Sequence, residues 1–175
     1  TFMDDEPFGV ILGDDIVYNP KRPALKQLID MYNETGATIL GCQEVEKEAV
    51  SSYGIIKGVP TETSNLYRVE DMVEKPAIEE APSRTAVLGR YVITPDIFPI
   101  LEQTQPGKGG EIQLTDALRV MAKNSSVYAY NFEGRRYDVG NKLGFLEATV
   151  EFALRRKDLG GPFADYLKQI VSGMK

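Results

Sequence analysis

The sequence contains no histidine among its 175 residues. That absence excludes the Ser-His and Cys-His nucleophile pairs, imidazole-ligated metal centres and the commonest general base of enzymes. Any chemistry of this chain must therefore use carboxylates, lysine and arginine side chains, or backbone groups.

Cysteine is almost as scarce, because Cys42 is the only one. A single cysteine excludes an intramolecular disulfide and favours a reducing compartment, so we expect a cytoplasmic protein. Cys42 follows the apolar run Ile39-Leu40-Gly41, which predicts a buried strand position rather than a reactive thiol.

Long apolar runs and an excess of basic charge are also missing. No stretch approaches the roughly 18 apolar residues of a membrane span, and the acidic start at Asp4, Asp5 and Glu6 does not suit a signal peptide. The net charge of −6 and the isoelectric point near 4.8 argue against a nucleic-acid surface. We therefore expect neither a membrane nor a nucleic acid as a partner.

What the chain does contain is the pattern of an α/β protein. Apolar periodicity predicts strands and helices, with Gly36 ending the first helix and Asn141 capping a long one. The expected strands are residues 8–12, 37–45, 54–59, 66–73, 86–93 and 127–132, and the expected helices are 23–32, 95–103, 115–123, 142–156 and 163–174. This order predicts a mixed, mainly parallel sheet with helices on both faces.

The first expected strand, residues 8–12, is typical of a buried parallel strand and lies close to the start of the chain. A domain that opens on a central strand is expected to be incomplete at its N-terminus. We treat residues 1–175 as part of a single domain that ends in helices within 142–174. Apolar side chains on those helices, such as Phe145 and Tyr166, suit either the core or a subunit interface.

Acidic side chains follow two of the apolar segments. The first expected strand leads into Gly13-Asp14-Asp15, and Asp138 stands before the long helix. Open α/β sheets bind ligands at the carboxyl ends of strands, and one or two carboxylates plus phosphate oxygens suit Mg²⁺. Asp14 and Asp138 are therefore candidate metal ligands, although each segment alone also suits an ordinary Asp-containing turn.

The segment Glu74-Lys75-Pro76 ends a strand with charges of both signs. Pro76 is expected to hold Lys75 in an extended conformation. Glu74 can accept hydrogen bonds from sugar hydroxyls, and Lys75 can contact a phosphate as a point charge. The alternative is a pair of solvated charges beside a turn.

Glycines mark further places where a ligand can approach the backbone. Gly54 and Gly89 each lie at or in an expected strand, where a bend or a bulge is the alternative. The loop at residues 107–111, which ends in Glu111, lacks the P-loop pattern and suits a sugar-contacting loop instead.

The order of these segments resembles the sugar-1-phosphate nucleotidylyltransferase family. The specific stretches are Gly-Gly-Glu-Ile-Gln-Leu-Thr-Asp at 109–116 and Asp-Val-Gly-Asn-Lys-Leu-Gly at 138–144, and the resemblance covers nearly the whole chain. It implies a Rossmann-like nucleotide-diphospho-sugar transferase fold and a Mg²⁺-dependent reaction between a sugar 1-phosphate and a nucleoside triphosphate. Within the family, the pattern is most similar to members that use UTP and glucose 1-phosphate. Thymidylyl- or cytidylyltransferases, and a non-catalytic sugar-phosphate-binding or assembly module, are the alternatives.

The resemblance also implies roles for particular residues. The family's two metal-holding aspartates correspond to Asp14 and Asp138, which act in catalysis together with Lys75. The implied contacts to sugar and phosphate are Gly54, Glu74, Lys75, Gly89 and Glu111. A homo-oligomer, dimer or tetramer, is implied as well.

One part of the family pattern does not occur in this sequence. A loop of the form Gly-x-Gly-Thr-Arg, followed by Pro and Lys, grips the triphosphate in the family, and the 175 residues contain no such segment. We therefore expect this chain to be the sugar-phosphate part of the enzyme and to be inactive alone. The attacking oxygen of glucose 1-phosphate is largely ionised at neutral pH, so no general base is needed, in keeping with the missing histidine.

Overall fold

The computed structural model describes residues 5–107 and 110–174 and divides into two compact units. Unit 1 contains the chain up to Leu12 together with Tyr18–Gly134. Unit 2 contains Gly13–Val17 and the chain from Arg135 onward. Each unit is described by itself.

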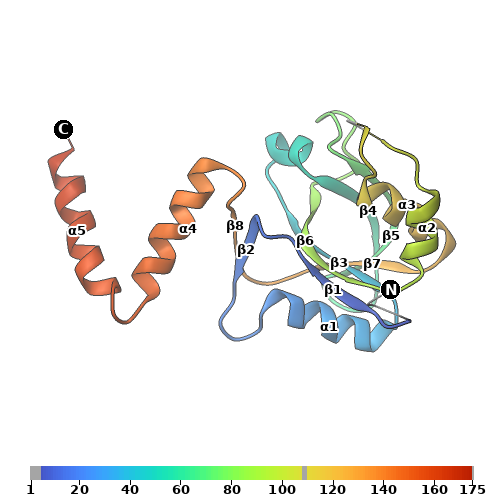
Figure 1. Ribbon diagram of the computed structural model, residues 1–175, viewed down its shortest axis with the longest axis horizontal. Coiled ribbons are helices and arrows are strands. Elements are labelled where there is room, and N and C mark those ends of the chain that lie inside the picture. Colours follow the sequence, from blue (N-terminus) through green and yellow to red (C-terminus); the bar gives the residue numbers. More distant parts are fainter. Residues whose placement is uncertain (1–4, 108–109, 175) are drawn as a thin grey trace. The chain divides into compact units, whose positions relative to one another are not determined.

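Unit 1 is built on a six-stranded sheet with the strand order β1-β6-β3-β7-β5-β4 (Figure 1). Its strands are β1 (Phe8–Ile11), β3 (Thr38–Glu44), β4 (Gly54–Pro60), β5 (Leu66–Glu74), β6 (Thr85–Ile93) and β7 (Val127–Asn131). Each corresponds to a strand expected from the sequence, so the mixed α/β class and the positions of these strands are confirmed.

The expectation of a mainly parallel sheet is wrong. Among the described pairings of this sheet, β3 with β7 is parallel, and the others are antiparallel. Strand β1 was expected to be a buried parallel strand, but it pairs antiparallel with β6 and its residues alternate between half-buried and exposed. An apolar run indicates a strand, but it carries no information on the direction of the strand beside it.

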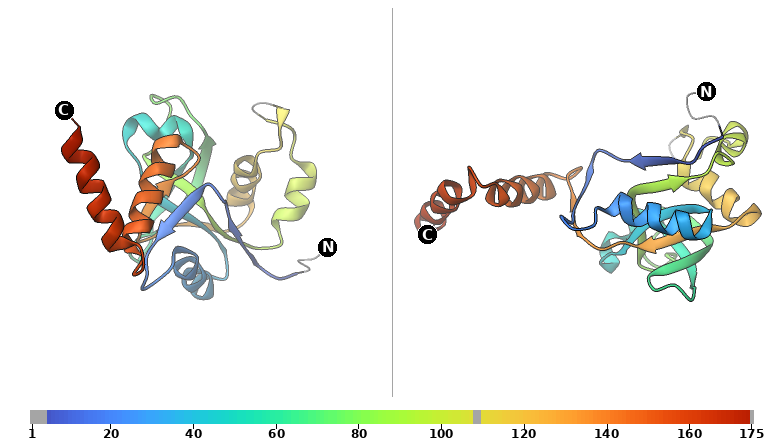
Figure 2. Two further views of the ribbon diagram at one scale, coloured as in Figure 1. Left: turned by 60° about the vertical axis from the view of Figure 1, so that its left-hand side comes forward. Right: turned by 90° about the horizontal axis from the view of Figure 1, so that it is seen from below.

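Helices cover both faces of this sheet, as expected. Helix α1 (Ala24–Thr35) faces Gly41 of β3, because a Cβ placed on Gly41 would lie 3.2 Å from Leu28 Cδ2. The flanking strand residues Leu40 and Cys42 point to the other face, where they share a core with α2 (Ile97–Gln103) and α3 (Leu114–Asn124). The right view of Figure 2 shows α1 beside the strands of unit 1. A short 3₁₀ helix, η1 (Lys47–Ser52), was not expected.

Two expectations about single residues are confirmed, the helix end at Gly36 and the buried position of Cys42. Gly36 ends α1 in the left-handed conformation, with φ of 65°. Cys42 is completely buried, and this burial raises the pKa of its thiol, so the side chain is an inert core residue.

Unit 2 consists of a two-stranded sheet and a helical hairpin (Figure 1). The strands β2 (Asp15–Tyr18) and β8 (Arg135–Asp138) were not expected, whereas α4 (Lys142–Arg155) and α5 (Gly160–Gly173) were. Asn141 caps α4 as expected, since its side-chain oxygen accepts a 2.7 Å hydrogen bond from Gly144 N. Within the described residues, every helix is too short or too polar to cross a bilayer.

Candidate functional site

A cluster in unit 1 forms where β4 begins and β5 ends. Gly54 is the first residue of β4 and lies opposite Glu74, the last residue of β5. Thr115, in the first turn of α3, donates a 2.6 Å hydrogen bond from Oγ1 to Glu74 Oε2. A Cβ on Gly54 would lie 3.0 Å from that carboxylate oxygen and 3.3 Å from the Thr115 hydroxyl. The fold thus brings together Gly54 and Glu74, two of the predicted site residues, and a side chain at position 54 would have to displace Glu74 or Thr115 slightly.

Lys75 follows Glu74 directly and carries a constrained backbone. Its φ is 46°, a left-handed value that is unusual for a residue with a side chain. The Lys75 backbone N donates a 3.0 Å hydrogen bond to Tyr53 O, which ties the turn to the start of β4. The Lys75 Nζ lies 3.9 Å from Glu74 Oε1, and its side chain is half exposed. Strained conformations of this kind cost about 1–3 kcal/mol and cluster at functional sites.

The expected extended conformation of Lys75 is therefore wrong. The residue before a proline is usually extended, but Lys75 adopts a positive φ here despite Pro76. The hydrogen bond between Lys75 N and Tyr53 O accompanies the left-handed geometry and turns the chain sharply after β5.

Helix α3, which carries Thr115, is fastened to β5 by a second polar contact. Arg119 binds the Asp71 carboxylate with both Nε and Nη2, at 2.5 and 2.9 Å. The hydrogen bonds from Arg119 hold the pKa of the Asp71 carboxyl below its ordinary value. Thr115 and Arg119 are four residues apart, so they lie on the same face of the helix.

The two other predicted sugar contacts, Gly89 and Glu111, accept backbone hydrogen bonds from residues outside this cluster. Gly89 has φ of 58° in β6, where the pairing with β3 shifts register, and its carbonyl accepts a hydrogen bond from Leu12 N. This geometry satisfies the bulge interpretation of Gly89. The Glu111 side chain is exposed, and its carbonyl accepts from Gly107 N. Lys108 and Gly109 of the same loop are outside the described residues.

The two predicted metal ligands meet in unit 2. Val139 N donates a 2.9 Å hydrogen bond to Asp14 O, which places the segment after β8 beside the segment before β2. A Cβ on Gly140 would lie 3.2 Å from Asp138 Oδ1 and 3.5 Å from Asp14 Oδ2. Oxygens of both carboxylates therefore flank one point, although the two residues are far apart in the sequence.

Asp15, the neighbour of Asp14, has a different environment. It is buried and forms an ion pair with Arg136, and the Arg136 Nη2 also lies 3.5 Å from Asp138 Oδ2. Asp14 is exposed by contrast. The geometry therefore fits the first aspartate of the Gly-Asp-Asp segment, rather than the second, as the ligand.

The chemistry of this pair suits a hard cation. Two carboxylates supply oxygen ligands, and Mg²⁺ typically takes one or two protein carboxylates together with phosphates and waters. Within residues 5–107 and 110–174, no group of three or more acidic, histidine or cysteine side chains is placed to hold a metal. The described side chains near this point therefore offer two carboxylates and no third acidic ligand.

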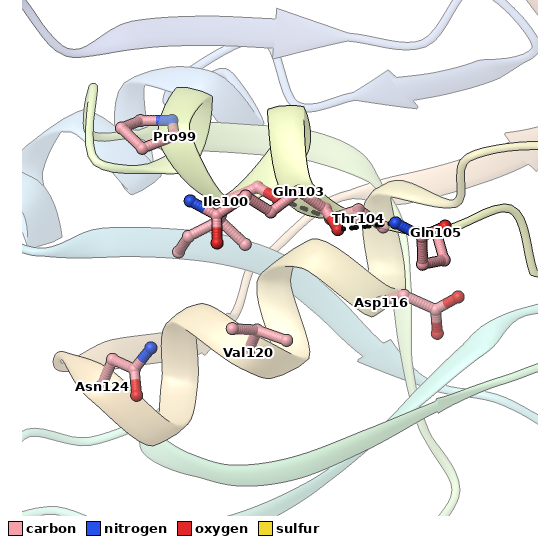
Figure 3. A pocket seen from close by; sticks show the side chains of 8 residues that line it. All are labelled: Pro99, Ile100, Gln103, Thr104, Gln105, Asp116, Val120 and Asn124. Carbon is pink, nitrogen blue, oxygen red and sulfur yellow. Dashed lines mark hydrogen bonds between the residues drawn. The ribbon is translucent and has the colours of Figure 1, made fainter.

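A cavity of about 570 Å³ lies elsewhere in unit 1, between α2 and α3 (Figure 3). Its described lining combines apolar and amide side chains with one hydroxyl and one carboxylate: Pro99, Ile100, Gln103, Thr104, Gln105, Asp116, Val120 and Asn124. Among these residues there is no lysine or arginine, and Glu74 is not one of them. This described lining differs from the Glu74-Lys75 cluster.

Sequence reasoning missed Thr115 as a member of the site. It was expected only as the first residue of the helix over 115–123. The available signal was its place in the Gly-Gly-Glu-Ile-Gln-Leu-Thr-Asp stretch, one of the two segments specific to the family resemblance.

The family model described as nucleotidyl transferase matches residues 1–154. The chain therefore belongs to the nucleotidyl transferase family.

Its relatives carry a more specific name. The chain is 49% identical over 97% of its length to the UTP–glucose-1-phosphate uridylyltransferase of Staphylococcus epidermidis. It is 48% identical over 98% of its length to the protein of the same name from Bacillus subtilis. In both cases the chain spans 58% of the relative's own length.

Solved structures agree with this similarity. A UDP-glucose pyrophosphorylase complexed with UDP-glucose matches with a TM-score of 0.85 and 46% identity, over 89% of this chain and 59% of that one. A UTP-bound pyrophosphorylase from Acinetobacter baumannii matches with a TM-score of 0.83 and 31% identity, over 99% of this chain and 59% of that one. The nucleotidyltransferase fold expected from the family resemblance is confirmed.

Proposed function

We propose that this chain is the sugar-phosphate-binding part of an enzyme that transfers a uridylyl group from UTP to glucose 1-phosphate. The products are UDP-glucose and pyrophosphate. The observation that carries the proposal is the Glu74-Lys75 pair at the end of β5, where Thr115 binds the carboxylate beside Gly54 and the Lys75 side chain is half exposed. The names of the relatives at 48–49% identity support the choice of UTP and glucose 1-phosphate.

The proposed chemistry needs positioning and charge neutralisation more than proton transfer. The nucleophile is a phosphate oxygen of glucose 1-phosphate, which is ionised at neutral pH because the second pKa of a phosphate monoester is about 6. Glu74 accepts hydrogen bonds from the sugar, and Lys75 places an ammonium group against the phosphate. The reaction can therefore proceed without histidine, in agreement with the composition.

Asp14 and Asp138 would hold a magnesium ion in this proposal, because their carboxylates flank one point in unit 2. When bound, the ion supplies positive charge that neutralises the phosphates during transfer. Gly140 contributes by leaving space beside both carboxylates and by donating its N–H to Asp138 Oδ1 at 3.1 Å.

We further propose a homo-oligomer, dimer or tetramer, located in the cytoplasm. Exposed apolar side chains on α4 and α5, such as Phe145, Leu146 and Tyr166, support an interface there. The single buried cysteine supports a reducing compartment.

The test is an assay of pyrophosphate release from UTP, glucose 1-phosphate and Mg²⁺. We expect turnover by the complete enzyme, in which this chain is accompanied by a glycine-rich nucleotide loop, and none by the 175-residue chain alone. Faster turnover with dTTP or CTP would identify a thymidylyl- or cytidylyltransferase instead. Binding of glucose 1-phosphate without turnover by the complete protein would identify a non-catalytic module.

A further inference from the structure

The hydrogen bond from Thr115 to Glu74 joins two elements at the proposed sugar site. At 2.6 Å between Thr115 Oγ1 and Glu74 Oε2, it is in the range of short, charge-assisted hydrogen bonds. The Glu74 side chain is only 19% exposed, so water does not readily replace this donor. The bond therefore has a strong influence on the orientation of the carboxylate.

The donor itself is held on a rigid support. Helix α3 buries Ala117, Leu118 and Met121 in the core of unit 1. On the helix face that carries Thr115, Arg119 donates two hydrogen bonds to the Asp71 carboxylate of β5. The position of the Thr115 hydroxyl relative to β5 is thus fixed by packing and by an ion pair.

The two carboxylate oxygens of Glu74 have different surroundings. Oε2 is engaged by Thr115 and abuts the backbone at Gly54, where an added Cβ would lie only 3.0 Å away. Oε1 faces Lys75, whose Nζ is 3.9 Å away, beyond hydrogen-bond distance. One oxygen is therefore used by the protein, and the other is directed toward the lysine that would meet the phosphate.

We propose that Thr115 is a positioning residue that fixes the carboxylate plane of Glu74 and presents Oε1 to a hydroxyl group of the sugar phosphate. This inference rests on the function proposed above. It assigns Thr115 a role through Glu74, without contact to the reacting phosphates. Because a fixed acceptor recognises a hydroxyl by direction as well as by distance, Thr115 also contributes to discrimination among sugars.

The first test compares Thr115→Val, which removes the hydroxyl at nearly constant volume, with Thr115→Ser, which keeps it. In the complete enzyme, we expect Thr115→Val to raise KM for glucose 1-phosphate by about 10- to 30-fold, as is common for residues that orient a ligand-binding group. KM for UTP should stay within about twofold, and Thr115→Ser should stay within about threefold of the unchanged protein. Thr149→Val is the matched control, because Thr149 is exposed and its hydroxyl bonds only within α4 in the described structure.

The second test uses deoxy analogues of glucose 1-phosphate that lack one hydroxyl each. The unchanged enzyme should reject at least one analogue by about 10-fold or more in kcat/KM, because Glu74 loses its partner. Thr115→Val should discriminate much less against that same analogue. A purely structural threonine would alter thermal stability and both KM values together, and it would leave the discrimination unchanged.

The outcomes separate this inference from the proposed function. If the unchanged enzyme shows no turnover that depends on glucose 1-phosphate, the proposed function is wrong. If the unchanged enzyme is active but Thr115→Val behaves like Thr149→Val, or Thr115→Ser is as impaired as Thr115→Val, Thr115 does not position Glu74.

Discussion

At the scale of the residue, the proposed sugar site depends on the absence of a side chain at Gly54. The space that a side chain would occupy there is bounded by the Glu74 carboxylate and the Thr115 hydroxyl. A methyl group added at this position would therefore displace the Glu74 carboxylate or the Thr115 hydroxyl more than it would disturb the rest of the fold.

The Gly54→Ala substitution tests this dependence. The new methyl group would push Glu74 or Thr115 by a few tenths of an ångström, so we expect glucose 1-phosphate to bind about tenfold more weakly, with a stability loss of about 1 kcal/mol. Isothermal titration and thermal melting measure the two effects. Gly161→Ala in α5 is the control, because an added Cβ there meets nothing within 4 Å. Equal ligand affinity in both variants would contradict the assignment of Gly54.

A second prediction concerns the exposed Asp14. The Asp14→Asn substitution removes one of the two carboxylate charges at the proposed metal site, so we expect the Mg²⁺ concentration for half-maximal activity to rise about tenfold or more. Asp158→Asn serves as a control, because Asp158 is exposed and pairs with Arg156 instead. Unchanged magnesium dependence in the Asp14 variant would remove Asp14 from the site.

At the scale of the element, the contact between α3 and β5 links stability to pH. The depressed pKa of Asp71 means that the folded state favours the ionised carboxylate. The stabilisation is therefore complete above the ordinary aspartate pKa of about 3.9 and is lost as the pH falls through the lower, folded-state value.

The Arg119→Met substitution tests this contribution. We expect the free energy of unfolding to fall by about 1 kcal/mol at pH 7, a small value because both side chains are partly exposed. The difference between the two proteins should shrink as the pH falls below about 3.9, because the unfolded state then binds a proton more readily than the folded Asp71 carboxylate does. Urea denaturation at neutral pH and in that acidic range gives the comparison, and a difference that grows on acidification would refute the proposed direction.

Element positions were largely predictable from the sequence, but their partners were not. Gly36 and Asn141 marked helix ends correctly, because capping depends on residues close in sequence. The direction of β1 and the pairing of β2 with β8 were missed, since both depend on segments distant along the chain. The conformation of Lys75 was also missed, because it accompanies a hydrogen bond to Tyr53 rather than following from Pro76 alone.

At the scale of the whole molecule, the proposed functional residues are divided between the two units. Gly54, Glu74, Lys75 and Thr115 lie in unit 1, and Asp14 and Asp138 lie in unit 2. The family resemblance supplied most of these residues, because isolated acidic and glycine-containing segments are common in turns. Only the structure added Thr115, through a contact between residues 41 positions apart.

The division predicts that unit 2 can be weakened selectively. The Arg136→Met substitution leaves the buried Asp15 carboxylate without its arginine, a change that typically costs about 3–5 kcal/mol. We expect faster amide hydrogen exchange in β2 and β8, with little change in β3 and β7 of unit 1. Arg135→Met is the comparison, because its partner Glu151 keeps Arg155 and Tyr137. Uniform acceleration across both units would show that they unfold together.

The pairing of β2 with β8 also bears on the order in which parts of the chain fold. Strand β2 precedes nearly all of unit 1 in the chain and β8 follows it, so their pairing closes a very long loop. Such a closure becomes favourable only after the intervening chain has become compact, and on the ribosome β8 is also synthesised late. We therefore expect Asp14 to come beside Asp138 only after unit 1 has folded. We expect a newly made chain to bring the two proposed metal ligands together late in folding, after the proposed sugar site in unit 1 has formed.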